Sequence, residues 1–300
     1  MKGRAKCIYR YRWQYGMIAL GIICLILFNY LPMLGIQIAF RNFKVGKTIW
    51  NADWVGLKNF WFLKDGEFWR VMKNTVILTF SKFIFTFPAP IILALLINEV
   101  KSVRLKKVVQ SITYIPHFIS WVVVAYILDS FLSPYTGVVN GIIQNLGGTP
   151  IFFMGSNKWF VPLFVIASVW KETGWGTIVY LAAISGISED MYEAARLDGA
   201  GRWARMKYIT LPSLLPTISM LFILALPGLL NAGVDAVYPL MNNANLEVST
   251  VLDVYVLKNG LERGQYSFST AVGLISSVFS LVLVLAANKI SEKTTGEGLW

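Results

Sequence analysis

Residues 193–212 read EAARLDGAGRWARMKYITLP, a polar stretch inside a very hydrophobic chain. Residues 173–188, just before it, contain no charged side chain, and neither do residues 208–234, which overlap its end. Apolar runs of this length are typical of helices that cross a bilayer, for which roughly 20 residues suffice. The stretch therefore reads as a loop that joins two membrane-spanning segments.

Within this loop, local signals predict two short helices separated by a bend. Ser188 is a candidate N-cap, and acidic residues follow it in the first turn, where the helix dipole stabilises them. Good helix formers follow, and Gly199 and Gly201 then predict a break. Pro212 suits the first turn of the next helix. Glu193 is exposed in this arrangement beside small alanines, which would let the backbone of another protein approach.

Composition places the whole chain among helical membrane proteins. Of its 300 residues, 56% are hydrophobic and only 14% are charged, whereas about a quarter are charged in soluble proteins. We expect an all-α polytopic membrane protein with a cytoplasmic segment at 1–14 and a single transmembrane domain at 15–300, whose loop occupies 187–212. The expected spans are about 15–38, 74–98, 108–130, 160–186, 212–233 and 267–288.

The basic residues predict the orientation of these spans. Lys and Arg gather in cytoplasmic loops, and an inside N-terminus puts most of the 27 basic residues on that side. Both termini are then cytoplasmic. The net charge of +11 therefore reflects topology, and we expect no nucleic-acid partner. The uncharged run at 13–40 is too long for a signal peptide and lacks a small-residue cleavage site, so it predicts a first, uncleaved span.

The segment 41–73 holds four tryptophans among basic residues, a composition typical of short pieces at the membrane–water interface. Its VGKT sequence does not make a phosphate loop, because that motif needs a glycine where Arg41 stands. We therefore expect no ATP-binding loop in this chain. Cys7 and Cys24 form no disulfide framework or metal spacing, and the lone His117 is expected to have a structural role.

The loop at 193–212 resembles the cytoplasmic signature of ABC importer permeases. That signature is Glu-Ala-Ala, a glycine after three further residues, and Ile-x-Leu-Pro after nine more. The matching residues here are Glu193, Ala194, Ala195, Gly199, Ile209, Leu211 and Pro212, and Asp198 with Ala200 fits its common Asp-Gly-Ala form.

Other stretches resemble the carbohydrate-uptake permeases of the maltose type. WVGLKNF at 54–60 and NTVILT at 74–79 resemble that family in general. LINEV at 96–100, YIPHFISWVVV at 114–124 and YSFSTAVGL at 266–274 resemble its branch that handles complex oligosaccharides. The resemblance covers nearly the whole chain.

This resemblance implies a type I importer permease fold and a division of labour among subunits. A separate ATPase dimer would bind ATP and Mg, so this chain would hold no cofactor and catalyse no covalent step. The partners would be two ATPase subunits, a second homologous permease in a heterodimer, an extracytoplasmic sugar-binding protein and membrane lipid. Glu193 would contact the ATPase, Gly199 would supply the bend, and the chain would lie in the bacterial cell membrane.

Charged residues inside a span usually face a cavity or a partner, because exposing them to lipid is costly. Lys171 and Glu172 lie near the middle of the expected span 160–186. A sugar binds through stacked aromatic faces and paired hydroxyls. We therefore expect these two residues, with Ser168, Trp170 and Trp175, to contribute to a sugar site. The alternative is that they pair with neighbouring spans, or with Lys82, and hold the bundle together.

A second candidate region lies at the end of the span 212–233. Pro227-Gly228 within a helix predicts a kink or an unwound turn, and carbonyls freed in a membrane are tolerated only where they are buried or face water. We therefore expect a cavity wall near Gly228 and Asn231. Tyr126 and Tyr238 are further candidates for sugar contact.

Two other classes of protein share some of these features. An ion-coupled secondary transporter also has intramembrane charges and broken helices, but it needs no loop of this kind. A membrane-embedded transferase would need acidic or histidine residues clustered at a membrane face. Within the ABC class, a permease for a non-sugar solute remains the main alternative.

Overall fold

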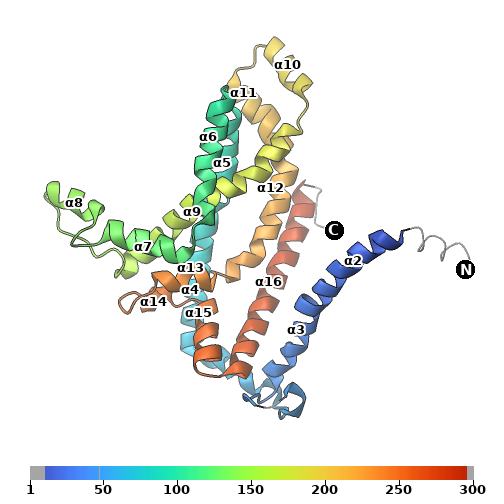
Figure 1. Cartoon of the computed structure of the whole chain (residues 1–300), viewed down its shortest axis with the longest axis vertical. Helices are drawn as coiled ribbons and strands as arrows, with labels where there is room; N and C mark the ends of the chain where they lie inside the picture. Colours follow the sequence, from blue (N-terminus) through green and yellow to red (C-terminus); the bar gives the residue numbers. More distant parts are fainter. Residues whose placement is uncertain (1–10, 47, 296–300) are drawn as a thin grey trace, which may run out of the picture. The chain divides into compact units, whose positions relative to one another are not determined.

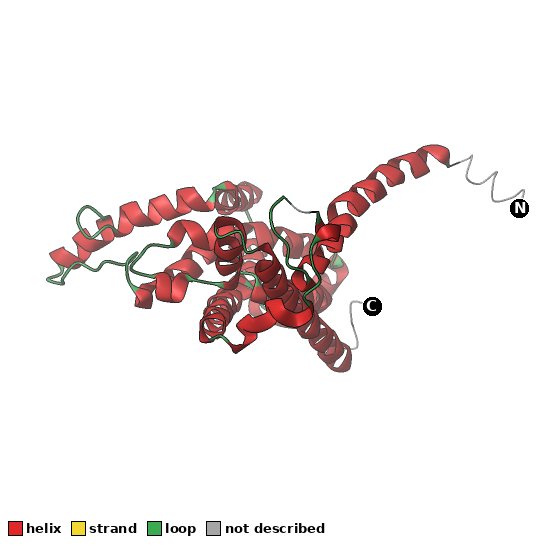
Figure 2. Ribbon diagram, turned by 90° about the horizontal axis from the view of Figure 1, so that it is seen from below, coloured by secondary structure: helices red, strands yellow, loops and turns green. Residues whose placement is uncertain are grey.

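The computed structural model describes residues 11–46 and 48–295, so most of the expected cytoplasmic segment, residues 1–14, lies outside the described residues. Within this part of the chain, helices are joined by short loops, and the β-type pairing is limited to one antiparallel bridge between Arg41 and Trp54 (Figure 2). The expectation of a helical protein is confirmed.

Four helical segments of this part of the chain are long and apolar enough to cross a membrane. They are Arg12–Phe40, Gly66–Asn98, Arg202–Leu230 and Tyr266–Lys289. A fifth candidate consists of two helices, Val103–Phe118 and Trp121–Leu132, which meet at a bend of 100°. The remaining expected span corresponds to the 29-residue helix α9 (Asn157–Ser185), which is long enough but less apolar because it carries Lys171 and Glu172.

The helix that contains the start of the expected span at 74–98 begins before that span. The helix starts at Gly66, eight residues earlier, and its first turns contain Glu67, Arg70 and Lys73. The prediction followed the uncharged run, whereas helix formation needs only residues with adequate backbone propensity. A helix can therefore begin several residues before the uncharged run that it contains.

The chain divides into two compact units, Met1–Asp65 with Val256–Ile275, and Gly66–Tyr255 with Ser276–Trp300. The first unit contains one long helical segment and short helices. They are α2 (Arg12–Leu25), η1 (Ile26–Tyr30), α3 (Leu31–Met33), η2 (Leu34–Phe40), η3 (Ile49–Asn51), η4 (Gly56–Lys64) and η9 (Lys258–Glu262). The last helix, α16 (Tyr266–Thr295), begins in this unit and continues in the second.

Aromatic rings hold the short helices of the first unit against the start of α16. Phe62 is fully buried, and its ring meets Phe268 edge to face with centroids 5.4 Å apart. Trp61 stacks on the same phenylalanine at 5.5 Å. Such aromatic pairs stabilise a fold by about 0.5–1.5 kcal/mol each beyond area burial. Residues 49–64 of the tryptophan-rich segment form short helical pieces, in agreement with its composition, whereas its last residues begin the long helix α4 (Gly66–Thr86).

The second unit contains the remaining helices. They are α4 (Gly66–Thr86), α5 (Pro88–Asn98), α6 (Val103–Tyr114), η5 (Ile115–Phe118), α7 (Trp121–Leu132), α8 (Val138–Asn145), α9, α10 (Glu189–Leu197), α11 (Arg202–Arg205), η6 (Met206–Thr210), α12 (Leu211–Ala225), η7 (Leu226–Leu230), α13 (Val234–Val237), η8 (Tyr238–Leu240), α14 (Leu246–Ser249) and α15 (Leu252–Leu257).

Two apolar clusters form the core of the second unit along α9. One joins α9 to α4, α7, α13 and α15 through buried residues such as Leu78, Trp121 and Phe164. The other joins α9 to α5 and α12 around Ile91, Tyr180 and Leu214. Since α9 contributes to both clusters, it is the element against which the rest of this unit packs (Figure 1).

The expected unwinding at Pro227-Gly228 is confirmed. The α-helix changes to a 3₁₀ turn at Leu226 and ends at Leu230. The carbonyl of Leu229 accepts a hydrogen bond of 2.6 Å from the Thr79 hydroxyl on α4. The freed backbone is thus satisfied by a neighbouring helix, which is what burial inside a membrane protein demands.

Beyond this turn, a carboxylate secures the main chain. Asp253 Oδ2 accepts hydrogen bonds from the backbone N–H groups of Ala232 at 2.7 Å and Gly233 at 3.1 Å. The pKa of Asp253 is raised above its ordinary value, mainly because the carboxyl group is buried. The two N–H groups oppose this shift, and the negative charge of nearby Asp235 adds to it. Gly233 has a φ of 82°, a conformation that side chains with a Cβ rarely adopt.

We expect Asp253→Ala to destabilise the protein by about 1–3 kcal/mol, because it leaves two N–H groups in a partly buried place without their acceptor. Asp253→Asn retains an acceptor oxygen and should therefore lower the free energy of unfolding by a smaller amount. The thermal unfolding midpoint of each variant in detergent measures this difference. Equal midpoints for Asp253→Ala and the parent protein would contradict the assignment.

Candidate functional site

A cavity of about 730 Å³ lies in the elbow between the two helices of the bent pair. We call it the elbow cavity. The six consecutive residues His117–Val122, which contain the bend, form one side of it, and Lys171 and Glu172 on α9 form another. The remaining lining residues come from the segment after the unwound turn and are Val234, Asp235, Tyr238 and Pro239.

A second cavity of about 320 Å³, here named the side cavity, shares His117 and Glu172 with the elbow cavity. Trp175, Gly176 and Ala225 line it, together with residues of α4 and α5. The two cavities therefore adjoin at this pair of residues. Aromatic faces next to carboxylates are typical of a surface that binds a polyhydroxylated ligand.

Glu172 is paired with a lysine from another helix. Lys82 Nζ on α4 lies 2.9 Å from Glu172 Oε1, and both side chains are partly exposed. The alternative in which these residues link neighbouring helices is confirmed for Glu172. Because the carboxylate has further lone pairs free for hydrogen bonding, the pairing leaves it able to accept from a ligand in either cavity.

Lys171 has a different environment, although it is adjacent to Glu172 in sequence. Its side chain is buried, and Nζ donates to the backbone carbonyls of His117 at 2.5 Å and Ile119 at 2.6 Å, with a longer contact of 3.4 Å to Pro116. All three acceptors lie at the bend between η5 and α7. The ammonium group thus binds the backbone of the elbow.

His117 stacks face to face on Trp175, with ring centroids 4.5 Å apart and an interplanar angle of 3°. The structural role expected for this histidine agrees with the stack. Its position on the wall of both cavities was not anticipated, because the sequence gives no sign that its partner is an indole on α9. In the described residues, no group of three or more His, Cys, Asp or Glu side chains could hold a metal ion.

The polar loop has the local structure that its sequence predicts. Ser188 accepts a hydrogen bond from the Asp190 N–H and begins α10. The helix ends at Leu197, and Gly199 follows with a φ of 79°, where the Ala200 N–H returns to the Ala195 carbonyl at 2.8 Å. The positive φ explains why the position needs glycine.

A side-chain contact connects the two halves of the loop. The Tyr192 hydroxyl on α10 lies 2.9 Å from the Thr210 hydroxyl on η6, the turn that leads into α12. Ile209 belongs to η6, and Leu211 and Pro212 begin α12. The spacing of the motif thus corresponds to a helix, a turn and a second helix that a side-chain contact connects.

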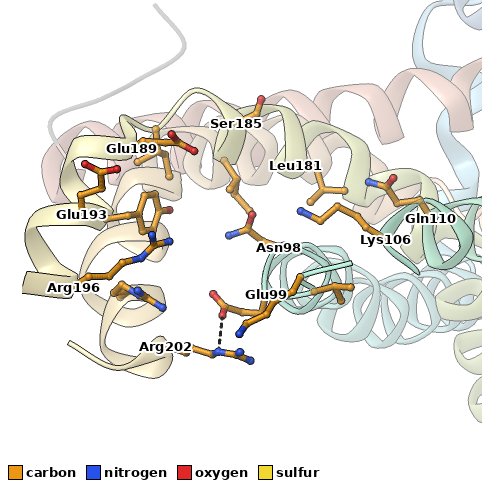
Figure 3. A pocket seen from close by; sticks show the side chains of 16 residues that line it. Asn98, Glu99, Lys106, Gln110, Leu181, Ser185, Glu189, Glu193, Arg196 and Arg202 are labelled. Carbon is orange, nitrogen blue, oxygen red and sulfur yellow. Dashed lines mark ion pairs between the residues drawn. The ribbon is translucent and has the colours of Figure 1, made fainter. Parts of the chain in front are cut away.

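A pocket of about 570 Å³ lies beside this loop and contains many charged groups (Figure 3). We call it the loop pocket. Glu189, Glu193 and Arg196 reach it from α10, and Glu99 and Lys106 from the other side. Arg202 lies 3.9 Å from Glu99 across it. Glu193 is exposed and has the freedom to meet another protein.

Comparison with known proteins decides the family. Residues 72–295 match the family described as binding-protein-dependent transport system inner membrane component. The chain belongs to this family. This permease is therefore an integral membrane component of a transport system and a transport subunit, with several apolar helices of the kind the structure shows.

Two relatives from Bacillus subtilis (strain 168) match the permease over most of their length. Protein LplB is 43% identical over 97% of this chain and 92% of its own. The polygalacturonan/rhamnogalacturonan transport system permease protein YteP is 42% identical over 96% of this chain and 90% of its own.

Two solved structures share its fold. One is a chain of a bacterial ABC transporter involved in the import of the acidic polysaccharide alginate. It has 40% identity and a TM-score of 0.87, and the match covers 97% of this chain and 98% of that one. The other is from a bacterial alginate ABC transporter in complex with a periplasmic protein bound to alginate pentasaccharide, with 39% identity, a TM-score of 0.88 and coverage of 98% and 99%.

The structure of this permease brings part of the expected sugar site together. Lys171, Glu172 and Tyr238 line the elbow cavity, and Trp175 lines the side cavity. The other expected residues line neither cavity. They are Ser168, which is fully buried, Trp170 and Tyr126, which are exposed, and Gly228 and Asn231, which lie at the unwound turn.

Sequence reasoning missed Trp121 and Asp235 as cavity residues, besides His117. Trp121 is almost fully buried and stacks on Phe164 of α9 at 5.7 Å. Asp235 follows the unwound turn directly. An acidic residue soon after a Pro-Gly break in an apolar span was the available signal, since a charge there needs an aqueous or polar environment.

Proposed function

We propose that this permease forms half of the pathway of an ATP-driven importer that moves an oligosaccharide delivered by an extracytoplasmic binding protein. The observation that carries the proposal is the match of nearly the whole chain, at 40% identity, to a chain of the alginate importer. The names of the relatives agree, because YteP serves polygalacturonan and rhamnogalacturonan.

The elbow and side cavities support an oligosaccharide as the substrate. Tyr238 and Trp175 supply aromatic surface that is 45% and 46% exposed, and Glu172 and Asp235 supply acceptors for hydroxyl groups. A sugar ring has apolar faces and a polar rim, so it can use both kinds of group at once. These residues are the part of the substrate site that we assign to this chain.

The rest of the assembly follows from the family. A second homologous permease would complete the pathway as a heterodimer, and two ATPase subunits would bind ATP and Mg. The coupling contact would involve Glu193, Ala194, Ala195, Asp198 and Gly199, with Ile209, Leu211 and Pro212 setting the second half of the loop. Six spans, counting the bent pair and α9, would leave both termini in the cytoplasm of a bacterial cell.

The decisive experiment is a screen of the purified complex with its own binding protein in lipid nanodiscs. Neutral and acidic oligosaccharides are tested for stimulation of ATP hydrolysis. We expect stimulation by at least one oligosaccharide and none by amino acids, polyamines or phosphate. Stimulation by a solute of those classes instead of a saccharide would contradict the proposal.

Trp175→Ala should raise the saccharide concentration for half-maximal stimulation roughly three- to tenfold, the equivalent of a lost aromatic contact. Trp170→Ala is the matched control, because both indoles lie on α9 and are 46% exposed, but Trp170 lines neither cavity. An equal effect in both variants would show that the side cavity is not part of the substrate site.

A further inference from the structure

The bend that forms the elbow cavity leaves main-chain groups without helical partners. Between η5 and α7 the chain turns by 100°, and Figure 1 shows α7 leaving α6 at this steep angle. Ser120 caps the start of α7 by accepting from the Val123 N–H. The carbonyls of His117 and Ile119 lie before this cap, outside the new helix. In a membrane, such groups need a donor from elsewhere in the protein.

Lys171 supplies that donor. An ammonium group has three N–H donors and no acceptor, and the carbonyls of Pro116, His117 and Ile119 are its three acceptors. The side chain is only 8% exposed. Its hydrogen-bonding capacity is therefore fully used by the backbone of the bend.

Two further contacts from the same face of α9 hold the same segment. A Cβ at Gly174 would collide with the main chain of Thr113, so α6 and α9 approach backbone to backbone there. Trp175 stacks on His117. Positions 171, 174 and 175 are three and four residues apart and thus share one side of the helix. Together they form a continuous surface against which the last turn before the bend packs.

We propose that Lys171 is a positioning residue that keeps the third expected span bent, and so holds the elbow wall His117–Val122 in place for the oligosaccharide. The inference rests on the proposed function for its ligand. In this proposal Lys171 does not contact the saccharide. The alternative is that it binds a carboxylate of the saccharide, since the names of similar transporters include acidic saccharides. Its donors are directed to the protein backbone.

The bend can be measured directly in the assembled importer. Spin labels are placed at Leu105 on α6 and Phe131 on α7, both exposed, after Cys7 and Cys24 are replaced by serine. A rise of about 1.5 Å per residue puts these positions roughly 40 Å apart in a straight helix and roughly 25 Å apart at the observed bend. The distance between the labels, measured by double electron–electron resonance, distinguishes the straight helix from the bent one.

Lys171→Met removes the donors and keeps the length of the side chain, so we expect a population at the longer distance. Lys82→Met is the matched control, because it removes the other intramembrane lysine of α4 and α9, which donates to Glu172 and not to the backbone of the bend. Its distance should equal that of the parent. If Lys171→Met does not assemble, Lys171→Gln should broaden the distribution toward longer distances. An unchanged distribution in the variant examined overturns the inference.

Saccharide response provides an independent readout. If the bent form falls to about one tenth of the population, the concentration for half-maximal ATPase stimulation rises about tenfold. Lys171→Met should show this rise equally for a neutral and an acidic oligosaccharide, and Lys171→Arg should restore much of the response. A loss limited to acidic saccharides would show that Lys171 binds their carboxylates, which overturns the inference. If no oligosaccharide stimulates the parent complex, the proposed function fails, and the distance measurement still decides the role of Lys171.

Discussion

Glu193→Lys is expected to abolish ATP-driven uptake while the importer still assembles in the membrane. Glu193 is exposed on α10 and faces the loop pocket, so its replacement changes no buried contact of the permease (Figure 3). Reversing a charge at a protein contact sets like charges against each other, which costs several kcal/mol. Since each 1.4 kcal/mol is a factor of ten, uptake should fall by roughly a hundredfold or more.

Uptake into proteoliposomes and ATP hydrolysis stimulated by the loaded binding protein measure this effect together. Glu193→Gln removes the charge without reversing it, so uptake and stimulated ATP hydrolysis should fall less in this variant. Glu292→Lys is the matched control, because it makes the same change at an exposed position of α16 outside the loop. Normal uptake by Glu193→Lys would show that this carboxylate is not part of the coupling contact.

Gly174→Ala should destabilise the permease more than the addition of one methyl group to a helix ordinarily does. A Cβ at this position meets the carbonyl group of Thr113, which belongs to the backbone of α6 and cannot rotate away. The two helices must separate, and this also strains the Lys171 and Trp175 contacts on the same face. Overpacking of this kind costs about 1–3 kcal/mol, and occasionally more.

Thermal unfolding of the purified permease in detergent tests this expectation. Gly174→Ala should lower the midpoint by about 5 °C or more. Gly141→Ala on α8 is the control, because a Cβ there meets nothing within 4 Å, and alanine should leave the midpoint unchanged or slightly raised. A Gly174→Ala protein as stable as the parent would mean that α6 and α9 do not approach as closely as described.

The elements that could be predicted from sequence are those specified by neighbouring residues. The N-cap at Ser188, the turn at Gly199 and the unwinding at Pro227-Gly228 all depend on the backbone preferences of a few adjacent residues. The helix start at Gly66 lies in charged sequence, outside the apolar run that predicts a span, because hydrophobicity indicates membrane burial and backbone propensity decides where a helix begins.

The cavity residues were only partly predictable. Glu172 and Tyr238 stood out as polar groups in or near apolar spans. Trp121 did not, since a tryptophan in an apolar run reads as core and is indeed almost fully buried. Ser168 lies one turn before Glu172 on the same face of the helix, but it is fully buried. Trp170 lies two positions before Glu172, and residues two apart on a helix do not share a face.

The sequence by itself determined the family, the helical class and the local form of the polar loop at 187–212, because each is encoded by residue type and short spacing. Only the tertiary structure decided what Lys171, Glu172 and His117 contact. The side-chain hydrogen-bond partners of Lys171 and Glu172, and the ring that stacks on His117, lie outside the helical element of each residue, 52 to 90 positions away in the chain. Adjacent charges thus have different surroundings: Glu172 pairs with Lys82 beside the cavities, and Lys171 turns to the backbone of the bend, because neighbouring helix positions point about 100° apart.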